Sequence, residues 1–114
     1  MSSKEQPEIA NPLAGGATPL STLVEYQEQA IVSRTLVHKS AGTVTLFAFD
    51  SGQGLSEHTT PYDALVYVVE GKGKITVSGT AHMVRQGEVM MMPANHPHAV
   101  QALERFKMLL VMVR

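Results

Sequence analysis

The strongest constraint on the fold is the regular alternation of short β-branched runs with glycine-containing turns. Seven of the nine glycines lie between Gly42 and Gly87, at spacings close to the roughly 8–12 residues expected between turns of an all-β sandwich or barrel. No segment longer than about ten residues carries a helical apolar stripe with capping residues. The sequence therefore predicts an all-β domain.

The predicted strands are short runs rich in Val, Ile, Thr and Tyr that end at Gly, Ser, Asp or Pro. They are expected at residues 30–38, 43–50, 64–69, 74–78, 81–85, 88–92, 99–103 and 106–113. Two hairpins are predicted, one joining the first two strands and one joining the third and fourth. Residues 21–29 are too few to distinguish a strand from a helical turn, and we favour a strand.

The chain of 114 residues is long enough for one domain with its own core. Residues 1–20 contain three prolines and the pair Gly15-Gly16, which predicts an extended or flexible N-terminal segment, followed by a barrel over residues 21–114. The absence of cysteine from the sequence excludes disulfides, thiol nucleophiles, zinc–thiolate sites and iron–sulfur clusters.

The charge balance gives no electrostatic reason to expect a polyanionic partner. Nine Lys and Arg residues face ten Asp and Glu residues, for a formal charge of -1, so neither nucleic acid nor an anionic membrane is an expected partner. The N-terminus lacks the apolar run of a secretory signal, and the longest apolar runs fall far short of the ~20 residues of a membrane helix. A cytoplasmic protein is expected.

Two of the five histidines stand where a loop meets a predicted strand. His58 follows the glycine-containing residues 52–57, and His98 follows the turn at residues 93–97. Barrels present functional groups toward a cavity at such junctions, and imidazole serves both as a proton carrier and as a metal ligand. On spacing alone, hydrogen-bonded structural histidines are the default interpretation, ahead of metal binding.

Two stretches of the chain resemble the two cupin motifs, in order and without gaps. They read Gly52-x5-His58-x-Thr60-x3-Ala64-x6-Gly71 and Gly87-x5-Pro93-x-Asn95-x2-His98-x3-Ala102. The chain thus resembles the cupin superfamily, as a small single-domain protein of the conserved-barrel type. The resemblance implies a double-stranded β-helix, or jelly-roll barrel, with antiparallel sheets, in a superfamily that includes dioxygenases, isomerases, decarboxylases and sugar-binding modules.

The metal-ligand positions of the motifs are only half retained. Cupins that hold a divalent metal typically use two His and one carboxylate from the first motif and one His from the second. The resemblance implies that His58 and His98 are the first and last of these ligands, whereas Thr60 and Ala64 replace the other two. Two imidazoles fall short of the usual three-ligand site, so any Fe, Ni, Mn, Zn or Cu ion is expected to be weakly held.

Strand alternation predicts further residues around the two histidines. His96 and Tyr62 are candidate additional metal ligands. The expected ligand pocket consists of Thr60, Tyr62, Ala64, His82 and Met92. The barrel wall is expected to include Val66, Val68, Ile75, Val77, Val84, Val89 and one or two of Met90, Met91 and Met92.

Three interpretations of the site remain open at this point. In the first interpretation, the chain is a metal-dependent enzyme of the oxygenase or isomerase type, with a weak divalent-metal site at His58 and His98. Alternatively, the barrel is metal-free and the imidazoles bind or act on a small polar molecule by hydrogen bonding and acid–base chemistry. In the third interpretation the domain is a regulatory or structural module. The final run, residues 106–113, is apolar on both faces apart from Lys107, which predicts a covering N-terminal segment or a homodimer.

Overall fold

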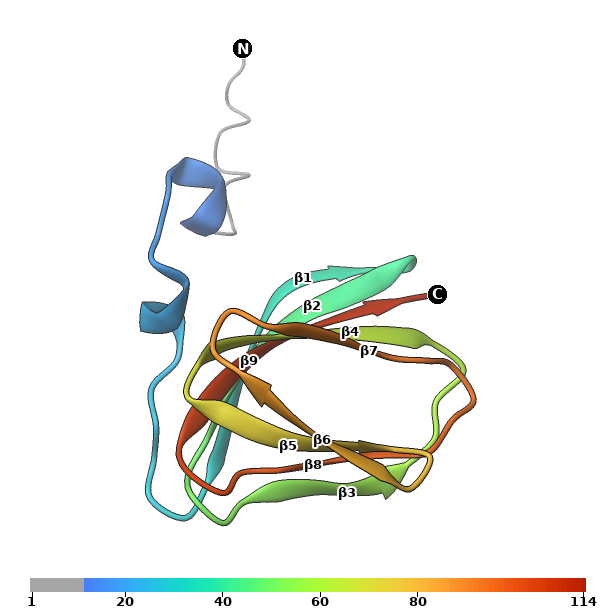
Figure 1. The fold of residues 1–114 in the computed structure, drawn as a ribbon. Coiled ribbons are helices and arrows are strands. Elements are labelled where there is room, and N and C mark those ends of the chain that lie inside the picture. Colours follow the sequence, from blue (N-terminus) through green and yellow to red (C-terminus); the bar gives the residue numbers. More distant parts are fainter. Residues whose placement is uncertain (1–11) are drawn as a thin grey trace.

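The computed structural model describes residues 12–114, which form a small all-β barrel (Figure 1). Two short 3₁₀ helices, η2 (Pro12–Gly15) and η3 (Leu20–Leu23), come first. The strands that follow are β1 (Ile31–Lys39), β2 (Gly42–Phe49), β3 (Gly54–His58), β4 (Asp63–Glu70), β5 (Lys72–Val77), β6 (Thr80–Arg85), β7 (Val89–Met92), β8 (His98–Gln101) and β9 (Phe106–Val113). The expected all-β class is confirmed.

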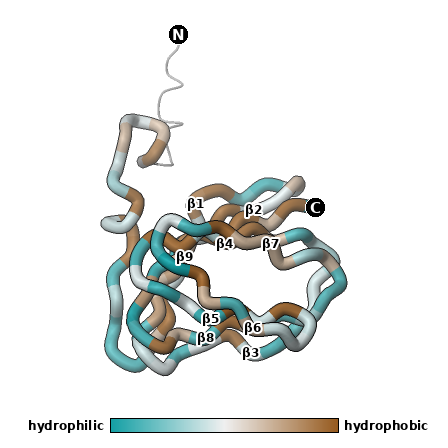
Figure 2. Tube along the Cα trace, in the orientation of Figure 1, coloured by the Kyte–Doolittle hydropathy of each residue, from teal (hydrophilic) through white to brown (hydrophobic). Residues whose placement is uncertain are grey.

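The strands form two antiparallel sheets that face each other (Figure 1). The larger sheet has the order β1-β2-β9-β4-β7, and the smaller has the order β3-β8-β5-β6. The chain crosses repeatedly between the sheets, which is the jelly-roll arrangement that the sequence predicted. Figure 2 shows that hydrophobic residues gather in the strands and hydrophilic residues in the connecting turns.

The core lies between the two sheets because alternate side chains of each strand point inward. On β4, Ala64, Val66 and Val68 are buried. The rings of Phe49 and Phe106 stack at 4.8 Å between centroids and fill one end of the barrel. Of the expected wall residues, Val89 is the exception: it is 56% exposed, because its cross-strand partner on β4 also faces outward.

A second apolar cluster lies on the outer face of the larger sheet. Val24, Leu36, Leu46 and Ala48 are buried there. The segment that precedes β1 runs along the outside of the barrel (Figure 1) and packs partly buried side chains onto this cluster, among them Leu13, Leu20, Leu23 and Tyr26. Residues 1–11 of the expected N-terminal segment lie outside the described residues.

Polar contacts fasten this segment to the barrel. The Tyr26 hydroxyl donates to Glu70 Oε2 at 2.6 Å, and the Lys107 ammonium donates to the Ser21 carbonyl at 2.7 Å. The guanidinium of Arg105 and the ammonium of Lys107 lie 5.2 Å and 4.9 Å from the centre of the Tyr26 ring. Burial, followed by the contact with Glu70, raises the pKa of the Tyr26 hydroxyl.

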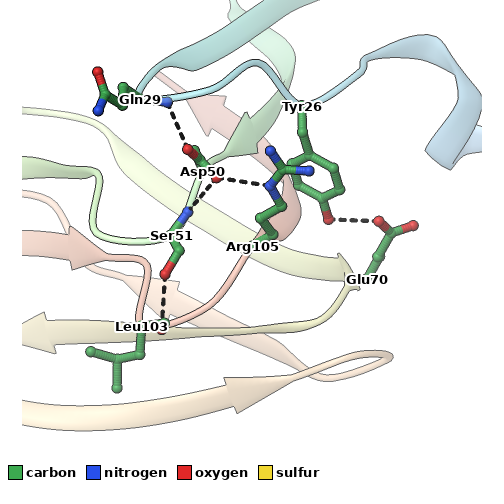
Figure 3. A network of polar contacts seen from close by, with 7 residues as sticks. All are labelled: Tyr26, Gln29, Asp50, Ser51, Glu70, Leu103 and Arg105. Atoms are coloured by element: carbon green, nitrogen blue, oxygen red, sulfur yellow. Dashed lines mark hydrogen bonds and ion pairs between the residues drawn. The ribbon is translucent and has the colours of Figure 1, made fainter.

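Asp50 organises the turn between β2 and β3 (Figure 3). Its carboxylate accepts from the Arg105 side chain at 2.8 Å, from the Gln29 backbone N–H at 2.6 Å and from the Ser51 backbone N–H at 2.9 Å. These donors, Arg105 first, lower the pKa of Asp50, and burial opposes them. The cluster joins residues distant in sequence just outside the Phe49–Phe106 stack.

Three local predictions are wrong. The favoured strand at residues 21–29 is instead η3 followed by a loop, because this segment is held by side-chain contacts and pairs with no strand among the described residues. The hairpin predicted between residues 64–69 and 74–78 does not form, since β4 and β5 belong to different sheets. Gly71, with φ of 77°, turns the chain from one sheet to the other. Strand β3 occupies part of the expected glycine-containing loop.

Among residues 12–114, no helix has the length and apolar character needed to cross a membrane.

Candidate functional site

The two histidines singled out from the sequence meet at one end of the barrel. His58 is the last residue of β3 and His98 the first of β8, and the register pairs them directly. Their Nε2 atoms lie 3.2 Å apart, and their rings meet edge to face at an angle of 74°. His98 is only 4% exposed, whereas His58 is open to solvent.

The hydrogen bonds assign the tautomers of this pair. The Nδ1 atom of His58 lies 2.9 Å from the Ser56 carbonyl, which accepts only, so that nitrogen carries the hydrogen. The Nε2 atom of neutral His58 is then an acceptor, and His98 donates its Nε2–H to it. The remaining nitrogen, Nδ1 of His98, is buried without a hydrogen-bond partner among the described residues. In this tautomer Nδ1 of His98 carries no hydrogen, so no buried N–H is left without an acceptor.

The environment of His98 favours its neutral form. Burial is the largest influence and lowers the pKa of His98, because a charged imidazolium loses solvation in the apolar interior. Proximity to His58 lowers it further, while the backbone of His96 acts in the opposite direction. A neutral imidazole is the form that can donate one hydrogen bond and accept another.

The turn before His98 is fixed by contacts to the loop after His58. The Asn95 backbone N–H donates to the Thr60 carbonyl at 2.7 Å, and Asn95 has φ of 65°. Asp63 accepts from the Ala94 backbone N–H at 2.9 Å. Asparagine tolerates this left-handed conformation better than most residues, which explains its place where cupins usually carry glycine. These bonds hold the two histidine-bearing strands together at this end.

The histidine pair borders a cavity of about 50 Å³ between the two sheets. At roughly 15 Å³ for each water, this cavity has room for about three. The wall is mainly apolar, and its polar side chains are the two imidazoles and Thr60. The lining residues are Leu55, His58, Thr60, Ala64, Met92, His98, Val100, Met108, Leu110 and Met112.

Three of the expected pocket residues do line this cavity. Ala64 and Met92 are buried cross-strand neighbours, and Thr60 lies at the rim. The Thr60 hydroxyl donates to the Tyr62 carbonyl at 3.2 Å. Ala64 presents only a methyl group at the position that the motif assigns to a carboxylate.

Tyr62, His82 and His96 lie outside the cavity. Pro61 breaks the alternation that would align Tyr62 with His58, and the Tyr62 ring instead lies 4.6 Å from the guanidinium of Arg114. His82 is on β6, the edge strand of the smaller sheet, and borders a separate open hollow with Met90. His96 is exposed, with its Nδ1 atom 3.0 Å from the Ala94 carbonyl.

The sequence interpretation missed half of the lining. Met108, Leu110 and Met112 alternate along β9, and Leu55 and Val100 come from the paired strands β3 and β8. Because β9 is apolar on both faces, its sequence could not show which set points inward. Their spacing of two was the available signal, shared with the inward-facing Phe106.

The donor set does not fit the divalent-metal site that the cupin motifs imply. Among residues 12–114, no group of three or more His, Cys, Asp or Glu side chains gathers around one point. The cavity offers two imidazole nitrogens and no carboxylate, whereas Fe, Mn and Ni centres usually need at least three nitrogen or oxygen ligands. Neither additional candidate, His96 or Tyr62, lines the cavity.

Comparison with solved structures supports the fold. A conserved protein of unknown function from Streptococcus pyogenes is 36% identical, with 87% of each chain covered and a TM-score of 0.84. A cupin superfamily protein from Desulfitobacterium hafniense is 30% identical, with 84% of this chain and 88% of that chain covered and a TM-score of 0.81.

A third match, a cupin 2 conserved barrel domain protein from Leptotrichia buccalis, is 46% identical, with 82% of this chain covered and a TM-score of 0.80. The match covers only 46% of the Leptotrichia chain. None of the functionally curated proteins is similar enough to match the chain. The family description "Cupin domain" matches residues 45–113, which span both motifs and all the strands from β3 to β9. The chain therefore belongs to the cupin family.

Proposed function

We propose that this cupin binds a small molecule in the cavity beside His58 and His98, with the imidazole pair as its polar anchor. The observation that carries the proposal is the 3.2 Å approach of the two Nε2 atoms at the wall of an otherwise apolar cavity. The volume of about 50 Å³ is far below the roughly 300–1,000 Å³ of drug-sized pockets. The expected ligand therefore has only a few non-hydrogen atoms, or inserts one small group of a larger molecule.

The chemistry of the pair suits hydrogen bonding and proton transfer. His98 offers an Nε2–H from the buried side, and His58 offers an acceptor nitrogen from the solvent side. A ligand that enters between them replaces one hydrogen bond by two. Because imidazole exchanges a proton near neutral pH, the same arrangement supports acid–base chemistry. We favour this metal-free function over a divalent-metal enzyme because the cavity lacks a third nitrogen or oxygen ligand of the motif.

Acetate is a suitable first probe of the cavity. Its carboxylate accepts the His98 Nε2–H and, when His58 is protonated on both nitrogens, the His58 Nε2–H as well. Its methyl group matches the apolar wall, and its four non-hydrogen atoms suit the small volume. Titration followed by NMR should give saturable shifts in the His98 ring signals and in the methyl signals of Ala64 and Met92. His58→Gln and His98→Asn should each abolish these shifts, while His38→Asn, an exposed change on β1, should not.

Two results would overturn the proposal. The first is the absence of any saturable acetate shift in the wild-type protein at pH 6 and at pH 8. The second is binding by folded His58→Gln protein that equals wild-type binding. Either result would leave the surface-module interpretation, in which the histidines have a structural role only.

A further inference from the structure

We propose that the cavity takes a soft monovalent metal ion, Cu(I), held by the two imidazoles together with methionine thioethers. This inference deepens the proposed function, on which it rests, by naming a class of ligand for the same cavity. It follows from the mismatch between the cavity and a divalent-metal site. The cross-strand neighbours of Ala64, which stands at the position of the missing oxygen donor, are methionines and carry sulfur.

The sulfur atoms come from the strands on either side of Ala64. In the larger sheet Ala64 pairs with Met92 on β7 and with Met112 on β9. Directly opposed residues in an antiparallel sheet have Cβ atoms about 4.5–5.5 Å apart, so both methionines flank the bare methyl group of Ala64. Both line the cavity that His58 and His98 border from the facing sheet.

The nitrogen atoms have a separation that two ligands of one ion require. At the metal–nitrogen distance of about 2.0–2.1 Å, two Nε2 atoms 3.2 Å apart subtend an angle of about 100–106° at the ion. This angle is close to tetrahedral and leaves space for a third or fourth donor. The bond from His58 Nδ1–H to the Ser56 carbonyl places the hydrogen of His58 on Nδ1, so the Nε2 lone pair of His58 is available to an ion.

Binding requires one proton shift at His98. Its Nε2 atom, which donates to His58 in the metal-free pair, must lose its hydrogen to act as a ligand. The hydrogen then resides on Nδ1, the buried nitrogen without a hydrogen-bond partner. This shift of the hydrogen to a buried nitrogen costs free energy, which bonds from the ion to sulfur must offset.

Cu(I) suits the rest of the cavity lining because it is a soft ion and carries only one positive charge. Thioethers select Cu(I) among the first-row ions, whereas Mn, Fe and Ni favour oxygen and nitrogen donors. The cavity offers no carboxylate to neutralise a second positive charge, and an unpaired charge in an apolar interior is expensive. Met92 is 3% exposed and Met108 is fully buried, so the methionine side of the site is shielded from water, whereas His58 faces solvent.

Anaerobic titration with Cu(I) in the presence of bicinchoninate, a chromogenic Cu(I) chelator, tests the proposal. The wild-type protein should withdraw one equivalent of Cu(I) from the chelator. The double variant Met92→Leu, Met112→Leu should bind Cu(I) at least tenfold more weakly, since leucine keeps the volume and loses the sulfur. Met91→Leu is the matched control. Met91 is 48% exposed on the outer face, so this variant should bind Cu(I) with the same affinity as the wild type.

Several results separate the soft-metal site from the small-molecule proposal. The soft-metal site is overturned if the wild-type protein withdraws no Cu(I), or if the double methionine variant binds it as the wild type does. Persistence of acetate shifts in the double variant, with Cu(I) binding lost, supports both proposals. Loss of Cu(I) and acetate binding together in His58→Gln, with the melting temperature retained, places both ligands at the same imidazoles. If wild-type protein shows acetate shifts but takes no Cu(I), only the soft-metal site fails.

Discussion

His98 gives the protein a specific dependence of stability on pH. Its pKa in the folded protein is lowered, first by burial and then by His58, whereas in the unfolded chain it titrates near 6.5. Between these two values the unfolded state binds more protons, so the free energy of unfolding rises with pH. The stabilisation is complete above pH of about 6.5 and declines as the pH falls below it. Urea unfolding at a series of pH values from 8 to 5 measures this slope.

Variants separate His98 from the other ionisable groups. His98→Asn should flatten the slope below pH 6.5, whereas His96→Asn, at an exposed position, should retain it. The lowered pKa of Asp50 acts in a lower range: its stabilisation is present above the ordinary value of 3.8 and is lost as the pH falls further. A wild-type slope of zero between pH 8 and 5 would contradict the assignment to His98.

Gly73 is required by the close approach of an aromatic ring. A Cβ atom there would lie 2.5 Å from two ring carbons of Phe106, and that ring is held by stacking on Phe49. Gly73→Ala should therefore destabilise the protein by about 1–3 kcal/mol through overpacking. Gly16→Ala, where no atom lies within 4 Å, is the control. If chemical denaturation gave equal unfolding free energies for the two variants, the Phe106 ring would have moved aside without a measurable loss of stability, which contradicts the prediction.

Single residues of the site differ in how well sequence predicted them. The motif positions of His58 and His98 located the pair, because a shared barrel brings the two motifs to the same end. Alternation alone failed for Tyr62 and His82, since it gives the face of a strand but not whether that face ends in a closed cavity or at an open edge. Pro61 breaks the alternation before Tyr62, and the edge position of β6 places His82 at an open hollow.

The segment before β1 should be a separately unfolding element. Tyr26→Phe retains the ring beside Arg105 and Lys107 but loses the hydrogen bond to Glu70. We expect a loss of about 1 kcal/mol, concentrated in faster amide hydrogen exchange around η3 and residues 24–29. Tyr67→Phe, at an exposed tyrosine on β4, is the control. Unchanged exchange in this segment would mean that apolar packing alone holds it.

Elements were predictable where local sequence decides the pairing. The hairpin of β1 and β2 was expected from its turn residues, and these strands do pair. The glycines at 71 and 73 gave an equally good local signal, yet β4 pairs with β7 and β9, and β5 pairs with β6 and β8, so the two do not pair with each other. The short strand β3 pairs only with β8 among the described residues, and four of its five residues are exposed, so it carries little alternation. Long-range pairing decided both outcomes.

At the scale of the whole molecule, part of the larger sheet remains uncovered. The segment before β1 covers the outer face around Leu46 and Ala48. Beyond it, the outward side chains of β4, β7 and β9 form neighbouring cross-strand pairs. These pairs include Leu65 with Met91, Leu65 with Val111 and Tyr67 with Val89. A continuous apolar sheet face of this kind is typical of an interface between subunits.

We propose that a second copy of the chain covers this face, as the apolar character of β9 already suggested. A two-fold axis through the face would place the same apolar residues of both copies against each other. Sedimentation equilibrium should give twice the monomer mass for the wild type and the monomer mass for Met91→Lys, because Met91 is 48% exposed within the patch, on its edge strand β7, and a lysine there would bury a charge in the interface.

The position of the exposed residue, and not its apolarity alone, should decide assembly. Leu103→Lys removes a leucine that is 52% exposed in the loop before β9, away from the patch, and should leave the dimer intact. A truncation that lacks residues 1–11 should also remain dimeric if the second copy is the occupant. A monomeric wild type would contradict the dimer. Dimer formation only after this truncation would identify the N-terminal residues as the occupant of the face, because a second copy could then bind only once they were removed.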